Sequence, residues 1–333
     1  MVDNSSLGSM KYIIGAYATA PSLNSNDKSL ESSFYNKLIK SIPQIEGLEL
    51  PFFGSSIHQF GSDFLLKFIK PEWNNVLTCI PGVMANLSKN PHFGIASDNN
   101  HGRVDAVDMY KRANQFVHKI NDIYGKQSII AVQLSTAPST PFKGVSSSKK
   151  SLVKSMNEIL NLDWQGAKIV IEHVDSSCNN LAFEKGFLTL KNEIEVLSTF
   201  SDIYDVGITI NWARSAIEGK DIYMPLEHIK LAIKSNLLRG LIFSGVSDND
   251  KNYGCWKDMH MPFAKSYDVK YFEENSLLTH ENISKTLKLV DLNALDYLGI
   301  KLLSMPLNTF DIDRRVGVNK DAIFILESII SEL

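Results

Sequence analysis

Short apolar runs recur along the chain and alternate with longer amphipathic segments. The runs are rich in Leu and β-branched residues and do not alternate strictly with polar positions. That pattern is typical of strands buried on both faces of a parallel sheet. Eight runs fit it: Tyr12–Tyr17, Leu48–Leu50, Val76–Ile80, Ile129–Leu134, Lys168–Ile171, Val206–Ile210, Leu238–Phe243 and Leu298–Leu303.

Between these runs, apolar residues recur at three- and four-residue spacing, as in helices that pack one face against a core. Alternating strands and helices with right-handed crossovers give either a closed barrel or an open doubly wound sheet. Eight units favour the barrel, and no Gly-rich dinucleotide fingerprint follows the first run. We therefore predict a single (β/α)8 TIM barrel over residues 10–333, with helices at Val104–Tyr124, Ser147–Leu162, Leu226–Ser235, Ile283–Asp296 and Lys320–Leu333.

Composition excludes several classes of protein. Hydrophobic residues make up 44% of the chain, enough for a large core. The chain has 34 Lys and Arg against 37 Asp and Glu, a net charge of -3, without a basic stripe, so we expect no nucleic-acid partner. The longest apolar runs are far shorter than the roughly 20 residues that span a bilayer, so we expect no membrane partner.

The ends and the cysteines indicate a cytoplasmic protein. Residues 1–9 lack the basic-then-apolar order of a signal peptide, and we expect them to be a leftover of cloning or a disordered start. Cys79, Cys178 and Cys255 are odd in number and widely spaced, which fits neither a disulfide framework nor a CxxC metal site. The sequence leaves a homo-oligomer open.

Polar residues gather at the ends of the predicted strands, where TIM barrels place their reactive groups. Glu172 is the clearest case, because a charge at the end of a buried apolar run costs several kcal/mol unless it is paired or binds a ligand. The bland alternative is a carboxylate that meets water. His173 should point to the opposite side of the strand, so a supporting role competes with a catalytic one. Further strand-end candidates are Glu49, Gln133, Asn211, Arg214 and Lys301.

Two long loops after strands add candidates. Pro81–Gly102 carries His92, and Gly245–Tyr271 concentrates aromatic residues around an Asp and a His, as in a lid or a covered insertion. After the sixth run, an amide, an indole and a guanidinium suit a polyhydroxylated or anionic substrate. The residues of these two groups are Tyr253, Trp256, Asp258 and His260 in the loop, and Asn211, Trp212 and Arg214 after the strand.

With these residues, the chain resembles the xylose isomerase-like barrels, a superfamily of sugar isomerases, epimerases and related lyases. The resemblance covers the whole chain as strand order and rests most on the Glu-His-x-Asp stretch from Glu172 to Asp175, which is similar to an acidic strand end that supplies a metal ligand. In many members a Glu, an Asp, a His and a second Glu hold a divalent ion. This chain departs from that pattern at Asn211 and Lys301, which implies an uncharacterised bacterial branch.

The departures lead to two expectations for a cofactor. Glu172 and His260 would share a weakly held Mg2+ or Mn2+ with an amide and waters, since hard ions accept such ligands. Alternatively, no metal binds, and Lys301 takes the place of the ion as a fixed positive charge.

The resulting functional prediction is an isomerase or epimerase that abstracts a proton next to the carbonyl of a sugar or sugar derivative. Glu172 is the base or a ligand, and Arg214, Asn211 and Lys301 bind the enolate oxygen. A carbon-oxygen lyase or glycoside-cleaving enzyme, and a non-catalytic sugar-binding protein, remain alternatives. Catalytic candidates are Glu172, His173, Lys301 and His260; substrate-binding candidates are Glu49, His92, Gln133, Asn211, Trp212, Arg214, Tyr253, Trp256 and Asp258.

Overall fold

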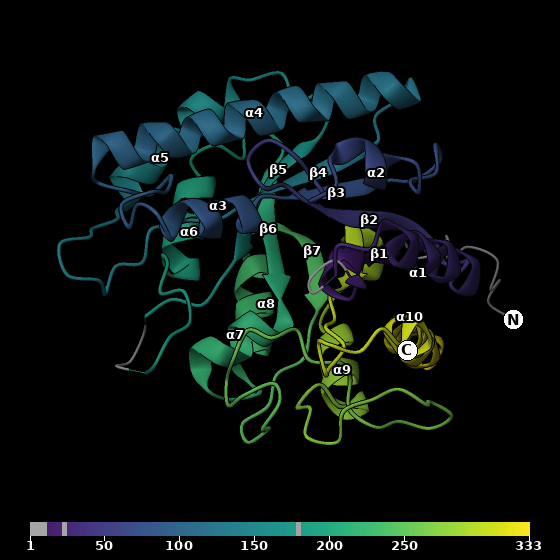
Figure 1. The fold of residues 1–333 in the computed structure, drawn as a ribbon. Coiled ribbons are helices and arrows are strands. Elements are labelled where there is room, and N and C mark those ends of the chain that lie inside the picture. Colours follow the sequence, from purple (N-terminus) through teal and green to yellow (C-terminus); the bar gives the residue numbers. More distant parts are fainter. Residues whose placement is uncertain (1–11, 22–24, 178–180) are drawn as a thin grey trace, which may run out of the picture.

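The computed structural model describes residues 12–21, 25–177 and 181–333 (Figure 1). The predicted start at residues 1–9 and Cys178 lie outside them. Within the described part, no helix has both the length and the apolar character needed to cross a bilayer. Cys79 is buried and Cys255 is exposed, and both are free thiols.

Eight parallel strands form a closed barrel in sequence order, which confirms the predicted fold. The barrel closes where β1 pairs with β8, with Tyr12 opposite Leu298 and Ile14 opposite Ile300. The strands are β1 (Tyr12–Ile14), β2 (Ile45–Pro51), β3 (Asn75–Thr78), β4 (Ile129–Leu134), β5 (Lys168–His173), β6 (Val206–Asn211), β7 (Leu238–Phe243) and β8 (Tyr297–Ile300).

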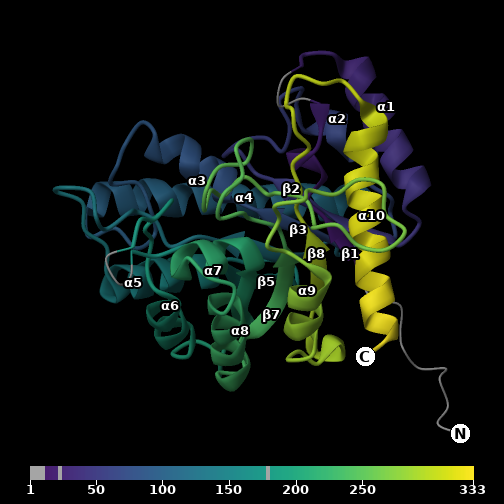
Figure 2. The same ribbon diagram turned by 90° about the horizontal axis from the view of Figure 1, so that it is seen from below.

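Helices surround the barrel, and α10 lies beside α1 in both views, where the last and first units meet (Figures 1 and 2). Side-chain caps start many of them; Asp27 and Asn99, for example, accept hydrogen bonds from the first turns of α1 and α4. The helices are α1 (Lys28–Ser41), α2 (Ser62–Leu66), α3 (Ile80–Leu87), α4 (Asn100–Tyr124), α5 (Lys149–Leu160), α6 (Leu190–Leu197), α7 (Trp212–Gly219), α8 (Met224–Lys234), α9 (His280–Leu287) and α10 (Ile312–Ser331), with short 3-10 turns η1 (Ala16–Ala18) and η3 (Leu292–Ala294).

Several boundaries differ from the predictions; for example, the first strand ends at Ile14 and the last helix already begins at Ile312. The predicted helix Ile283–Asp296 is divided into α9 and η3, because Asp291 accepts a hydrogen bond from the backbone of Asn293 and starts a new turn. The predicted loop Pro81–Gly102 contains most of α3. The eighth strand ends at Ile300, so Lys301 is the first residue beyond it.

The two faces of β5 pack into different layers. Val170 belongs to a small apolar cluster with residues of other strands, including Ile13 and Ile242, whereas Ile169 and Ile171 pack in the large cluster shared with the helices. Successive side chains of a strand point to opposite faces. Glu172 therefore projects into the barrel on the side of Val170, and His173 projects toward the helices.

Candidate active site

Four charged side chains meet at the carboxyl ends of the strands, and each is at most 2% exposed. The ammonium of Lys301 lies 2.8 Å from Glu49 Oε2 and 3.9 Å from Glu172 Oε1. Arg214 Nη1 lies 2.8 Å from the same oxygen of Glu172. Asn211 supports this oxygen more weakly, because its amide donates at 3.4 Å. Strand ends that are far apart in sequence thus build one charged layer, which we call the mouth cluster: Glu49, Glu172, Arg214 and Lys301.

The loop between β7 and α9 covers this cluster and adds Asp258 to it; Figure 2 shows the light-green segment reaching across the barrel toward α10. Asp258 Oδ2 lies 3.2 Å from Arg214 Nε and 2.8 Å from Lys185 Nζ. Reciprocal backbone hydrogen bonds between Gly245 and Met261, of 2.8 and 3.0 Å, close the base of the loop. The loop is therefore tied to the barrel through a buried guanidinium.

Opposite charges are matched in this site, with carboxylates on Glu49, Glu172 and Asp258 and cations on Lys301, Arg214 and Lys185. Burial by itself lowers the pKa of Lys301, but the carboxylates of Glu172 and Glu49 outweigh burial and raise it well above its ordinary value. The amine is a cation at neutral pH, so it serves as a fixed charge rather than as a nucleophile.

The two carboxyls beside Lys301 differ. Burial raises the pKa of Glu172, but Arg214 and Lys301 reverse that effect, and the net direction is downward. For Glu49, burial outweighs the attraction of Lys301, and the pKa is raised. Glu49 therefore binds a proton more tightly than Glu172 does, which makes it the better candidate for a general base.

His260 lies beside Asp258 in the covering loop. Its Nδ1 is 3.0 Å from Ser244 Oγ and 3.3 Å from Asp258 Oδ1. Burial lowers the pKa of the imidazole to about 3, although Asp258 acts in the opposite direction. The imidazole of His260 is therefore neutral in the folded protein at physiological pH.

The mouth does not fit a divalent ion as the barrel family would hold one. Glu172 Oε1, the predicted ligand atom, already has Arg214 at 2.8 Å and Lys301 at 3.9 Å. Lys301 also neutralises Glu49, so a divalent ion would add charge to a site whose carboxylates are already matched. The geometry favours the second of our two expectations, in which the Lys301 ammonium stands in the place of the ion, over an ion shared by Glu172 and His260.

Two buried carboxylate oxygens at the mouth have no hydrogen-bond partner among the described residues: Glu49 Oε1 and Glu172 Oε2. Buried polar atoms are normally satisfied, and groups that are not mark positions where a ligand or water donates. Hydroxyl groups of a ligand are among the donors that would satisfy these two oxygens. This chemistry is compatible with a polyhydroxylated ligand.

Sequence reasoning missed three contributors to the mouth. The Tyr17 ring packs with its centroid 5.4 Å from Lys301 Nζ, and Lys185 supports Asp258. Gly15 leaves room for the lysine, because a Cβ there would lie 3.0 Å from Lys301 Cγ. A signal for Gly15 and Tyr17 was available, since both lie at the carboxyl end of the predicted first run: Gly15 directly follows β1 and Tyr17 lies in η1. Lys185 lies in a connection that shows no pattern.

Other predicted residues do not join the mouth cluster. The Gln133 amide donates to Tyr297 OH at 3.2 Å, and Tyr297 belongs to the apolar cluster of inward-facing strand residues. Trp212 is fully buried in the core and donates to Thr286 of α9 at 3.1 Å, so packing explains it and substrate binding does not. The reason is that β6 ends at Asn211, whose side chain caps α7. Trp212 is already the first residue of the helix, so its side chain no longer follows the alternation of the strand and points toward the helices.

The remaining loop candidates have structural contacts. Tyr253 OH binds Glu273 Oε1 at 3.2 Å and the carbonyl oxygen of Leu303 at 3.0 Å, which holds the covering loop in place. Trp256 is half-buried and packs against the core. For His92, the contact we observe is a backbone one, from its N–H to Asn90 Oδ1 at 3.0 Å. Substrate binding by these three residues stays a prediction.

His173 lies outside the barrel wall, between Glu193 of α6 and Glu218 of α7. Its Nδ1 is 2.7 Å from Glu193 Oε2, and its Nε2 is 3.2 Å from Glu218 Oε2. The predicted catalytic role does not agree with this position, because the ring is on the opposite face of β5 from Glu172.

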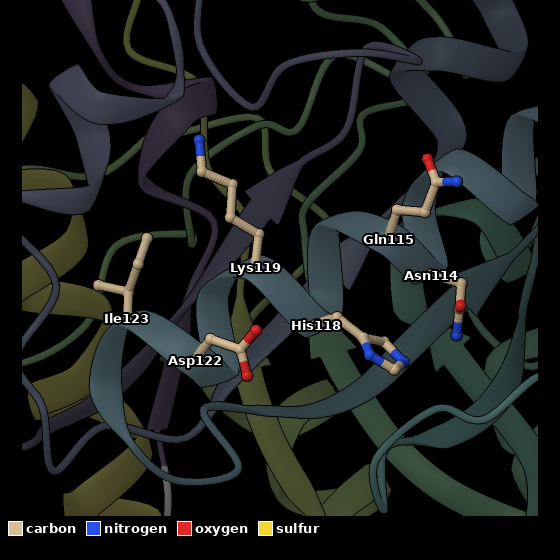
Figure 3. A pocket seen from close by; sticks show the side chains of 6 residues that line it. All are labelled: Asn114, Gln115, His118, Lys119, Asp122 and Ile123. Atoms are coloured by element: carbon tan, nitrogen blue, oxygen red, sulfur yellow. The ribbon is translucent and has the colours of Figure 1, made fainter.

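The largest surface hollow that we describe, about 720 Å³, is remote from this chemistry. Figure 3 shows that its side chains follow one another along the outer face of α4. His118 and Asn114 there bind the carbonyl oxygen of Asp163, which is ordinary packing of a helix on a loop. The lining residues are Asn114, Gln115, His118, Lys119, Asp122 and Ile123.

Comparison with known proteins places the chain in a family. The family described as "Domain of unknown function (DUF4862)" matches residues 13–318. The chain belongs to this family. A relative in Salmonella typhimurium, strain LT2, described as "Uncharacterized protein STM3670", is 37% identical over 313 residues, which cover 94% of this chain and 95% of the relative.

Solved structures establish the fold of this family member as xylose isomerase-like. A xylose isomerase domain protein from Alicyclobacillus acidocaldarius matches with a TM-score of 0.53 at 11% identity, covering 96% of this chain and 99% of that one. A D-psicose 3-epimerase, solved in the presence of D-fructose, matches with a TM-score of 0.52 at 13% identity, covering 88% and 93%. At these identities the likeness is one of fold, and the fold is one that carries sugar isomerases and epimerases.

Proposed function

We propose that the protein is an isomerase or epimerase of a sugar or sugar derivative, in which the Lys301 ammonium does the electrostatic work that a divalent ion does in other xylose isomerase-like barrels. One observation carries the proposal: a buried, protonated lysine held 2.8 Å from Glu49 and 3.9 Å from Glu172 at the catalytic end of the barrel. The names of the structural neighbours support the substrate class.

The chemistry follows from the charges. Removing a proton next to a carbonyl places negative charge on the carbonyl oxygen, and a fixed cation in a buried site stabilises that charge. Lys301 and Arg214 are the cations available at the mouth. Two carboxyls flank Lys301, Glu49 and Glu172, and they are the candidates for the group that takes the proton.

Of these carboxyls, Glu49 is the better base by its raised pKa. Glu172, whose pKa is lowered, remains ionised and orients both Arg214 and Lys301. We propose that Glu49 removes the proton and then returns a proton to the neighbouring carbon, while Glu172 stays ionised and holds the two cations in place.

Substrate entry requires the covering loop to open. Each side chain of the mouth cluster is at most 2% exposed, and Asp258 of the loop binds Arg214 directly. Closure of such a loop over the substrate excludes water and strengthens the electrostatic interactions inside.

The test is solvent deuterium exchange. Chelator-treated protein is incubated in D2O with aldoses, ketoses, their phosphates and their uronic acids, and NMR follows the hydrogen next to the carbonyl. Exchange in at least one compound without added metal, lost in Lys301→Met, is the expected result. Release of an aglycone from glycosides without such exchange would indicate carbon-oxygen cleavage, and binding without exchange would indicate a sugar-binding protein; either result contradicts the proposal.

A further inference from the structure

A second cluster of metal-ligand residues lies on the outer side of the barrel wall, behind Glu172. His173 ends β5, Glu218 lies in the last turn of α7, and His228 lies in α8. One ligand atom from each of the three lies within 4.8 Å of the others. Figure 1 shows α7 and α8 as neighbours beside β6, the strand that follows β5 in the barrel.

The spacing of the atoms matches a coordination sphere. His173 Nε2 is 3.2 Å from Glu218 Oε2, and His228 Nε2 is 3.6 Å from Glu218 Oε1. The backbone N–H of Ser176 also donates to Glu218 Oε2, at 2.6 Å, and holds this carboxylate in place. Around a tetrahedral Zn2+, with bonds of about 2.0–2.1 Å, neighbouring ligand atoms are about 3.4 Å apart. The three groups therefore need little movement to receive an ion between them.

The ring nitrogens that face away from Glu218 have their own partners. His173 Nδ1 is 2.7 Å from Glu193 Oε2, and His228 Nδ1 is 2.9 Å from Ser215 Oγ. Metal-bound histidines usually donate the second N–H to a carboxylate, carbonyl or hydroxyl, which fixes the tautomer and the ring orientation. Both rings here meet that condition, so each presents Nε2 toward the carboxylate of Glu218.

Burial and charge agree with an ion. Glu193 and His173 are fully buried, whereas Glu218 and His228 keep 6% and 7% of their surface exposed, which gives the cluster one side near solvent. A second bond to Glu193, from Thr136 Oγ1 at 2.5 Å, holds that carboxylate in place. A divalent ion with two neutral imidazoles balances the charges of Glu193 and Glu218.

We propose that His173, Glu218 and His228 form a site for a divalent transition metal of the Zn2+ class, with Glu193 and Ser215 as supporting residues. The site is separate from the mouth cluster and joins β5 to α7 and α8. Its role is to anchor the end of β5, where Glu172, the residue before His173, projects into the mouth. The proposal does not depend on the sugar chemistry of the previous section.

The test uses the full chain without a histidine tag, dialysed against a chelator and titrated with Zn2+ by calorimetry. We expect one ion per chain and a rise in melting temperature with Zn2+ concentration. His228→Asn and Glu218→Gln should each weaken binding at least tenfold. The matched control is His58→Asn, which disrupts another buried His–Glu pair, with His58 Nε2 2.7 Å from Glu31 Oε1, and should leave Zn2+ binding unchanged.

The rival explanation is a hydrogen-bonded network that holds the elements together without a metal. It predicts no stoichiometric Zn2+, or weak binding that His228→Asn and Glu218→Gln do not change, and either result overturns the proposal. If those variants do not fold, X-ray absorption of the Zn2+-loaded wild-type protein decides the matter. Two imidazoles in the first shell are expected, and a shell without imidazole overturns the proposal.

Discussion

Replacing Lys301 by Met tests the electrostatic design of the mouth. Met keeps much of the volume of the side chain but leaves Glu49 and Glu172 buried without the cation between them. With an effective dielectric constant of about 20, the contact at 2.8 Å corresponds to about 6 kcal/mol of attraction and that at 3.9 Å to about 4 kcal/mol. Breaking a buried pair costs about 3–5 kcal/mol after desolvation is counted, and we expect a loss in that range.

This loss should depend on pH. Without Lys301, the pKa of Glu49 in the folded state, already raised by burial, should rise further above that of the unfolded chain. A carboxyl whose folded pKa is raised is tolerated when protonated, so the variant should lose stability as pH increases through that folded pKa. The free energy of unfolding, measured by urea denaturation at several pH values between 5 and 8, should fall toward the alkaline end more steeply in Lys301→Met than in the wild-type protein.

Two further variants make the result decisive. Lys168→Met is the control, because Lys168 pairs with Asp205 and Asp296 in a partly exposed position, where an ion pair is worth about 0–1 kcal/mol. Adding Glu49→Gln to Lys301→Met removes the stranded charge and should restore much of the stability. If Lys301→Met is as stable as the Lys168→Met control, or if the added Glu49→Gln restores no stability, the Lys301 ammonium does not stabilise the buried carboxylates.

Three other predictions follow from the same contacts. Glu172→Gln removes the carboxylate that orients Arg214 and Lys301 and should lower turnover about a hundredfold or more. The variant should still fold, because Asp258 and Glu49 continue to pair with the two cations. Normal turnover, or failure to fold in thermal unfolding, contradicts this prediction. Gly15→Ala places a Cβ 3.0 Å from Lys301 Cγ, so it should lower kcat by displacing the lysine while the melting temperature stays close to that of the wild-type protein. An unchanged kcat would show that the lysine has room for the added methyl group. Burial lowers the pKa of His260 to about 3, so between about pH 3 and 6.5 the unfolded chain binds one proton more than the folded chain. The free energy of unfolding should therefore fall as pH decreases through this window. Urea denaturation should show a smaller fall in His260→Gln, and an equal fall contradicts the prediction.

The strand runs and the strand-end polar residues could be predicted because both depend on local pattern. A buried parallel strand requires a continuous apolar run, so a charge at its end, as at Glu172, stands out in the sequence. The position of Lys301 followed in the same way, although it lies one residue beyond β8. The approach of Glu49, Glu172 and Lys301 to one another then follows from closure of the barrel.

Several of the residues that were missed or misplaced lie on helices. Glu193, Glu218 and His228 come from α6, α7 and α8, and nothing in an amphipathic helix marks which polar residue faces a histidine on a neighbouring strand. Trp212 was assigned to the site because it follows an apolar run, but the chain turns into α7 at that residue. Sequence pattern gives the faces of elements, and contacts between the outer faces require the three-dimensional arrangement.

A crystal structure of the chelator-treated protein, soaked with Mn2+ and with a sugar that undergoes solvent exchange, shows whether Lys301 replaces the metal. The anomalous signal of Mn2+ locates the ion, and the difference density locates the sugar. We predict that a carbonyl or hydroxyl oxygen of the sugar lies within hydrogen-bond distance of Lys301 Nζ, with no Mn2+ peak between Glu49 and Glu172. A Mn2+ peak between those two carboxylates, with Lys301 displaced from them, would show that a metal ion and not the lysine supplies the positive charge of the site.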